Sequence, residues 1–238
     1  MPNNAPASRA SLEQALLPHG LRVFGGLVPD ALDALPPMPG GRSAEVVWMV
    51  GQVGSECWGA FSSSGFYGDA QPNPMDRWAK SIGNTLALQW GGIAIYPSDG
   101  PPFYPFQRWG KRAEPVQTSP LMLQIHPQYG LWHAYRFALA LPDLPADDLH
   151  TLTLTSAVPD PDLCLHCNGQ PCLSACPVDA FTGTAYEIDR CSGHLHGPNS
   201  NTCMPGGCQA RHACPVGTAF RYRPEHAAFH MAAFAARH

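Results

Sequence analysis

The chain has 238 residues, enough for one large domain or two modest ones, and 45% of them are hydrophobic, which allows a substantial core. A formal charge of −4 at pH 7 and an isoelectric point near 6.2 leave no basic surface, which argues against nucleic acid as a partner. No signal peptide begins the sequence, and no apolar run approaches the roughly 20 residues of a membrane span. We therefore expect a cytoplasmic protein whose cysteines stay reduced.

The first 115 residues carry alternating helix and strand signals. Ser8 or Ser11 is expected to cap a short first helix. Asn73-Pro74 opens the clearest helix, since apolar side chains recur at helical spacing after it. We expect helices at residues 8–17, 54–61, 75–90 and 106–113, strands at residues 21–27, 45–50 and 93–96, and Pro/Gly-rich loops at residues 29–42 and 97–105.

Two more strands are expected at residues 121–125 and 131–141, joined by the segment 126–130. Residues 142–162 are rich in Pro, Asp and Thr and are interpreted as a linker. Pro224 starts a final helix. The sequence thus predicts an α+β protein with two domains, residues 1–150 and residues 151–238, the second ending in that helix.

Eight of the nine cysteines lie close together in the C-terminal third. They follow the pattern Cys164-x2-Cys167-x4-Cys172-x3-Cys176-Pro177, then Cys191, then Cys203-x4-Cys208-x5-Cys214-Pro215. Two groups of four, each ending in Cys-Pro, are typical of a ferredoxin that holds two iron-sulfur cubanes with thiolate ligands. This pattern predicts a small ferredoxin-like domain with two 4Fe-4S clusters.

In such ferredoxins the cysteine before proline binds the other cluster, so the chain crosses between the two sites. The expected ligands of the first cluster are Cys164, Cys167, Cys172 and Cys214. The expected ligands of the second cluster are Cys176, Cys191, Cys203 and Cys208. Two zinc sites of four thiolates each are the alternative, although zinc does not require the two Cys-Pro ends. Cys57, the ninth cysteine, is expected to be a buried core thiol.

Segments that precede the cysteines in the sequence resemble a known protein family. The segment Ile125-His126-Pro127-Gln128-Tyr129-Gly130-Leu131-Trp132 resembles the IHPxFGGW segment of the CblC family of cytosolic cobalamin-processing proteins. Asn73-Pro74-Met75-Asp76 and the stretch from Tyr104 to Trp109 match further family segments in the same order. The cysteine-rich part is similar to the iron-sulfur module of epoxyqueuosine reductase and the reductive dehalogenases. Gln128 departs from the family, which has an arginine associated with thiol substrates.

This resemblance implies a nitroreductase-like α+β domain that binds a corrinoid, followed by a ferredoxin-like domain that feeds it electrons. The cofactor-binding candidates are Tyr104, Arg108, Trp109, Arg112, His126 and Tyr129. Arginines would meet the periphery of a corrinoid, or of a flavin as the less favoured cofactor, and aromatic rings would pack on it. The alternative is that these side chains form a packing face or a domain interface. No catalytic residue emerges from the sequence.

Two functions follow as hypotheses. The first is an iron-sulfur redox protein that transfers single electrons between an external redox partner and cobalamin in its N-terminal domain, which makes it a corrinoid-linked oxidoreductase. The second is a dedicated ferredoxin-type carrier, in which the N-terminal domain has no organic cofactor and only docks a partner oxidoreductase.

Overall fold

The protein is an α+β protein in the computed structural model, which describes residues 7–155 and 163–238. The described chain divides into two compact units. The first unit comprises residues 1–52, 56–115 and 134–157, and the second comprises residues 53–55, 116–133 and 158–238. The expected boundary near residue 150 differs from this division, because residues 116–133 pack with the cysteine-bearing part rather than with the strands around them.

Among the described residues the main sheet has four strands in the order β1-β2-β6-β3. These strands are β1 (Arg22–Leu27), β2 (Val46–Val53), β6 (His133–Leu141) and β3 (Ile93–Ile95). β1 pairs antiparallel with β2, with a bulge between Val23 and Gly25, and β3 pairs antiparallel with β6. All eight residues of β2 are buried, as its apolar run predicts for a strand covered on both faces.

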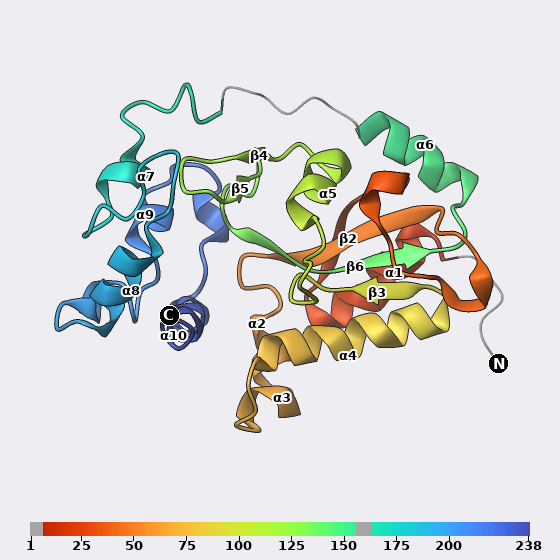
Figure 1. The fold of residues 1–238 in the computed structure, drawn as a ribbon, viewed down its shortest axis with the longest axis horizontal. Coiled ribbons are helices and arrows are strands. Elements are labelled where there is room, and N and C mark those ends of the chain that lie inside the picture. Colours follow the sequence, from red (N-terminus) through yellow and green to blue (C-terminus); the bar gives the residue numbers. More distant parts are fainter. Residues whose placement is uncertain (1–6, 156–162) are drawn as a thin grey trace. The chain divides into compact units, whose positions relative to one another are not determined.

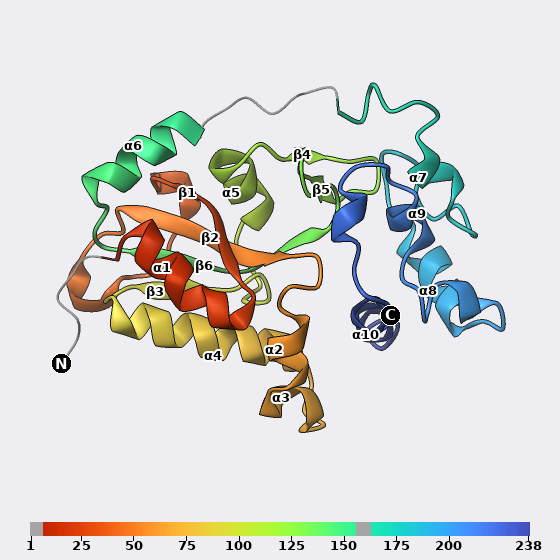
Figure 2. The same cartoon turned by 180° about the vertical axis from the view of Figure 1, so that it is seen from behind.

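The described part of the first unit also contains helices. They are α1 (Arg9–Leu16), α2 (Trp58–Ser62), α3 (Gly65–Gly68), α4 (Pro74–Gln89), α5 (Phe106–Ala113) and α6 (Ala146–Thr155). α4 runs along the edge strand β3, whereas α1, α5 and α6 contact β1 (Figures 1 and 2). The predicted helices at residues 8–17, 75–90 and 106–113 are confirmed, with Ser8 as the cap that accepts the Ser11 N–H at 3.1 Å. Short 3₁₀ helices follow α1 and interrupt the loop at residues 29–42.

Three expectations need correction. The helix expected at residues 54–61 begins only at Trp58, because β2 continues to Val53. The linker expected at residues 142–162 contains the ten-residue helix α6, and its remaining residues 156–162 lie outside the described residues. The strand expected at residues 121–125 is limited to β5 (Gln124–Ile125), which pairs antiparallel with β4 (Gln117–Thr118).

The second unit is built from short helices and loops around its cysteines. Its helices are α7 (Pro171–Ser174), α8 (Ile188–His196), α9 (Gln209–His212) and α10 (Pro224–Ala235), with short 3₁₀ helices at Ser200–Thr202 and Thr218–Phe220. Cysteine side chains form part of its apolar clusters, together with Leu121, Ile125, Leu131 and Leu195. In the described part of the chain, no helix has both the length and the apolar character to cross a bilayer.

Candidate functional site

Four cysteines of the second unit line one cavity. Cys164 and Cys167 come from the loop that leads into α7, Cys172 lies in α7, and Cys214 comes from the loop that follows α9. The other walls of the cavity are mainly apolar. These walls are formed by Ser119, Pro120, Leu121, Ile125, Leu131, Leu163, Gln170, Pro215 and Val216. This group of cysteines is the first of the two sets expected from the Cys-Pro pattern.

The environment of this first cysteine group disfavours free thiolates. Burial, with smaller contributions from the neighbouring Cys214, Cys172 and Cys167, raises the pKa of Cys164 to about 11. Burial likewise raises the pKa values of Cys172 and Cys214. Several thiolates this close together repel one another unless a positive charge lies among them. Without a positive charge among them, these thiols therefore stay protonated at neutral pH.

The second cysteine group is formed by Cys176, Cys191, Cys203 and Cys208. Burial raises the pKa of Cys208 to about 11, with further contributions from Cys191 and Cys203. Burial is also the main cause that raises the pKa of Cys191, and Cys176 and Cys203 add to it. These mutual effects indicate that the four thiols are close neighbours. Cys191 lies on α8, and the Ala180 N–H donates to Cys176 Sγ at 3.3 Å.

Aromatic and aliphatic side chains cover the second cysteine group. Tyr186 stacks on Phe181 with ring centroids 4.6 Å apart, and its hydroxyl interacts with Cys191. Burial and the neighbouring cysteines raise the pKa of Tyr186 above its ordinary value, so the hydroxyl stays protonated and can donate. Met231 and Phe234 of α10 pack against Cys203 and its neighbours. Aromatic rings and side chains of α10 thus cover part of the second cysteine group.

The chemistry of the donor set fits an iron-sulfur cluster. Each group offers four thiols and no carboxylate, and soft thiolates are the ligands that such clusters take. Within residues 7–155 and 163–238, no three His, Cys, Asp or Glu side chains are grouped so that they could hold a single metal ion. Cys57 belongs to the first unit, where it is fully buried, as expected for a core thiol.

The HPQYG segment supports the loop that carries Cys214. Gly130 has a φ of +58°, and a side chain there would collide with the carbonyl oxygen of Val216. Gly217, with a φ of +69°, is equally close to the backbone of Tyr129. Glycine is the residue that permits both this backbone conformation and this approach. The segment that resembles the CblC family is therefore part of the cysteine-bearing unit.

His126 and Tyr129, two of the cofactor-binding candidates, lie within this segment. His126 Nδ1 accepts the N–H groups of Gln128 at 3.0 Å and Tyr129 at 3.2 Å, and its ring stacks on Tyr129 with centroids 4.4 Å apart. Burial lowers the pKa of His126 to about 4, so the ring is neutral at physiological pH. The contacts of His126 are those of a residue that holds a turn together.

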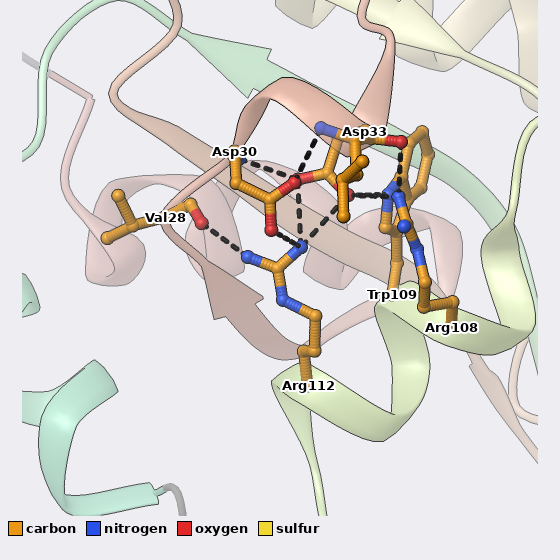
Figure 3. A network of polar contacts seen from close by, with 7 residues as sticks. Val28, Asp30, Asp33, Arg108, Trp109 and Arg112 are labelled. Atoms are coloured by element: carbon orange, nitrogen blue, oxygen red, sulfur yellow. Dashed lines mark hydrogen bonds and ion pairs between the residues drawn. The ribbon is translucent and has the colours of Figure 1, made fainter.

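Three other candidates, Arg108, Trp109 and Arg112, surround a buried carboxylate in the first unit (Figure 3). The Asp33 side chain is fully buried and accepts hydrogen bonds from Trp109 Nε1 at 2.8 Å, from Arg108 at 2.7 Å and from Arg112 at 2.8 and 2.9 Å. The Asp30 N–H donates to it at 2.8 Å. Burial by itself would raise the pKa of Asp33, but these hydrogen bonds and the Arg112 charge lower it. Asp33 is therefore held as an anion.

A wide, open hollow lies beside this network. It has about 790 Å³ of space free of atoms and is lined by Leu32, Asp33, Ala34, Asp99, Gly100, Pro101, Pro102, Phe103, Tyr104 and Pro105. Tyr104 stacks on Trp109 with ring centroids 6.0 Å apart. The structure thus brings Tyr104, Arg108, Trp109 and Arg112 together in the first unit, whereas His126 and Tyr129 belong to the second unit.

Sequence reasoning missed two buried acidic residues. Asp33 looked like part of a loop, and only the unbalanced charge of three basic residues on α5 hinted that a carboxylate was needed. Glu114 accepts a short hydrogen bond from the Tyr135 hydroxyl, and burial raises its pKa to about 7. No local sequence pattern pairs Glu114 with Tyr135, because they lie in separate elements, the end of α5 and the strand β6.

Comparisons of the chain with protein-family models, with curated proteins and with solved structures gave no match. The class of the protein therefore follows from its own architecture. It is an α+β protein. One unit is built on a four-stranded sheet, and the second unit gathers eight cysteines into two groups.

Proposed function

We propose that this chain is an iron-sulfur redox protein whose eight gathered cysteines hold two 4Fe-4S clusters. The observation that supports this most is the cavity lined by Cys164, Cys167, Cys172 and Cys214, which draws on two separate segments of the chain. The Cys-Pro ends of both motifs favour clusters over zinc, which four thiolates alone would also suit. When bound, such clusters take up and release single electrons.

The chain's own residues would hold the clusters and control their surroundings. The eight thiolates provide the bonds, and the apolar walls of the first cavity exclude water. The Tyr186 hydroxyl is placed to donate to Cys191, an interaction that makes the second group more electron-accepting. Because Cys214 and Cys176 each belong to the group opposite to their sequence neighbours, each group depends on both motifs.

We further infer that the first unit is nitroreductase-like, the second unit is ferredoxin-like, and a corrinoid in the first unit accepts the electrons in the cytoplasm. The resemblance to the CblC family supports this part of the proposal, as does the hollow lined by Tyr104 and Asp33. An external redox partner would supply or remove the electrons.

A specific observation favours the second function, a ferredoxin-type carrier whose first unit holds no organic cofactor. Arg108, Arg112 and Trp109 would be the main corrinoid contacts, yet all three bond to Asp33. This pairing is what a packing role requires. Tyr104 remains the candidate that lines the hollow directly, so the fit of a corrinoid to these side chains is partial.

The cluster proposal is tested by anaerobic purification followed by iron, sulfide and zinc analysis. We expect about eight iron and about eight acid-labile sulfide per chain, with a brown colour. A colourless protein with about two zinc per chain and no sulfide would replace the proposal with two structural zinc sites.

The corrinoid proposal needs its own experiment. Holoprotein is incubated anaerobically with cobalamin, and the corrinoid spectrum and its retention on gel filtration are recorded. Retained cobalamin with a shifted spectrum supports the first function. If cobalamin stays free in solution, and none co-purifies with the protein from a cobalamin-fed expression host, the result supports the carrier function. The iron content is expected to be the same in either case.

A further inference from the structure

The last helix carries two histidines whose rings meet. His226 and His230 lie four residues apart on α10, so they share one face of the helix. Their Nε2 atoms are 3.0 Å apart, and their ring centroids are 4.8 Å apart. His226 is fully buried, whereas His230 is partly exposed. Two ring nitrogens thus point at each other at the edge of the second unit, with one side open to solvent.

The other nitrogen of His226 is held by a residue far away in sequence. Ser55 Oγ lies 3.0 Å from His226 Nδ1 and accepts the Arg223 N–H at 2.8 Å. Tyr222 stacks on the His226 ring at a centroid distance of 4.2 Å and an interplanar angle of 18°. These contacts fix the position and plane of the ring. A hydroxyl on Nδ1 is the type of partner that orients a metal-binding histidine and leaves Nε2 to bind the ion.

We propose that His226 and His230 form a binding site for one exchangeable divalent transition-metal ion, separate from the cysteine groups. Two histidines at this helical spacing are a recurrent way to bind such an ion with imidazole nitrogens. The ion replaces the hydrogen bond between the two Nε2 atoms and lies to one side of the line that joins them. His226 then carries its own proton on Nδ1 and donates it to Ser55 Oγ.

The distance between the two nitrogens selects the kind of ion. With metal-nitrogen bonds of about 2.1 Å, nitrogens 3.0 Å apart subtend an angle of roughly 90° at the metal. This is the angle between neighbouring ligands in square-planar and octahedral coordination, which Ni²⁺ and Cu²⁺ adopt. Tetrahedral Zn²⁺ would require the nitrogens to separate by about 0.4 Å. We therefore expect this pair of histidines to bind Ni²⁺ more tightly than tetrahedral Zn²⁺.

Two features limit the affinity. In the described residues no third His, Cys, Asp or Glu joins the pair, so water completes the coordination. The guanidinium of Arg211 lies 4.4 Å from the centre of the Tyr222 ring, which places a positive charge near the site. The ion is thus expected to exchange with the solution rather than to stay bound through purification.

The test uses protein purified anaerobically with its cysteine-bound metal in place, whichever metal that is, so that free thiols do not take up the added ion. Ni²⁺ alone is titrated by isothermal calorimetry into the wild-type protein and into the variants His230→Gln and Ser55→Ala. We expect one site per chain in the wild type, at least tenfold weaker binding in His230→Gln, and about tenfold weaker binding in Ser55→Ala.

His238→Gln is the matched control, since it removes an exposed histidine near the end of the same helix and should leave Ni²⁺ binding unchanged. Unfolding temperatures without added Ni²⁺ show whether each variant keeps its fold, and His226→Gln provides a second variant if His230→Gln does not. Equal Ni²⁺ affinity in the wild type and in a folded His230→Gln or His226→Gln variant would overturn the proposal. Its failure leaves the iron and sulfide content untouched, so it is distinguishable from failure of the cluster proposal.

Discussion

The two units gather polar groups in opposite ways. In the first unit, the buried Asp33 supplies a negative charge that two arginines and a tryptophan of the same chain satisfy. In the second unit, four thiols converge on one cavity, and burial together with their neighbours raises their pKa values where a shift is resolved. The first arrangement is complete within the chain. In the cluster proposal the second acquires its balancing charge from a bound centre, so we expect the two units to respond differently to metal loss and to charge mutations.

The largest effect is expected from Cys172→Ser. This change removes one ligand of the first cysteine group, so iron should fall from about eight to about four per chain or fewer. The second unit should lose its near-ultraviolet circular dichroism because cysteine side chains form part of its core. Cys57→Ala is the control: it alters a buried thiol outside both groups and should retain all iron. Full iron in Cys172→Ser would remove this residue from the ligand set.

Gly130→Ala should come next. The new methyl group would meet the backbone of the loop that follows Cys214, and the positive φ adds about 1 kcal/mol of strain. Displacement of that loop should lower the iron content by up to half. Gly41→Ala has a similar φ of +71° but no neighbouring atom within 4 Å, so it separates strain from collision. Equal iron content in both variants would show that the close backbone contact is unimportant for metal binding.

Asp33→Asn tests the first unit. Loss of the central charge leaves Arg108 and Arg112 facing a neutral amide, and should cost about 3 kcal/mol of unfolding free energy in urea. The value is at the low end for a buried pair because the side chains of Arg108 and Arg112 are 40% and 31% exposed. Iron content should not change.

Glu56→Gln provides the comparison for Asp33→Asn, because it breaks a half-exposed ion pair with Arg22 and should cost less than about 1 kcal/mol. A change of similar size in the two variants would contradict a special role for Asp33. Cobalamin binding that disappears only in Asp33→Asn would instead connect this network with a cofactor.

The smallest effect concerns pH. Burial raises the pKa of Glu114 from 4.5 to about 7, so its stabilising contribution is fully present below pH 4.5 and is lost as pH rises through 7. Between pH 5 and pH 7 the loss amounts to about 2 kcal/mol. Urea unfolding of Glu114→Gln should lack this slope relative to the wild type. Parallel pH profiles of the two proteins would show that Glu114 is ionised throughout.

Local patterns in the sequence predicted the regular elements well. α4 follows from apolar spacing and from the proline at its start, and most of β2 was recognisable because the residues from Val46 to Val50 are all apolar. α6 was missed because the acidic and Thr-rich residues after Pro145 look like a linker. The predicted cysteine sets also depended on spacing alone, and they match the two groups that the fold assembles.

Long-range pairing was not accessible from the sequence. Asp33 meets Trp109 and Arg112 across more than seventy positions, and Gly130 meets Val216 across an even longer separation. The division of the chain therefore differed from the expected domains, since residues 116–133 join the cysteine-bearing unit. No local periodicity reports such contacts, because they arise from packing between distant segments.

The central claim is that two cysteine groups hold two redox-active clusters. Its most direct test is a reductive titration of the anaerobically purified protein followed by electron paramagnetic resonance at low temperature. We predict uptake of about two electrons per chain and the rhombic signals of reduced 4Fe-4S clusters, halved in Cys172→Ser. A protein that accepts no electrons and stays silent after full reduction would contradict the claim.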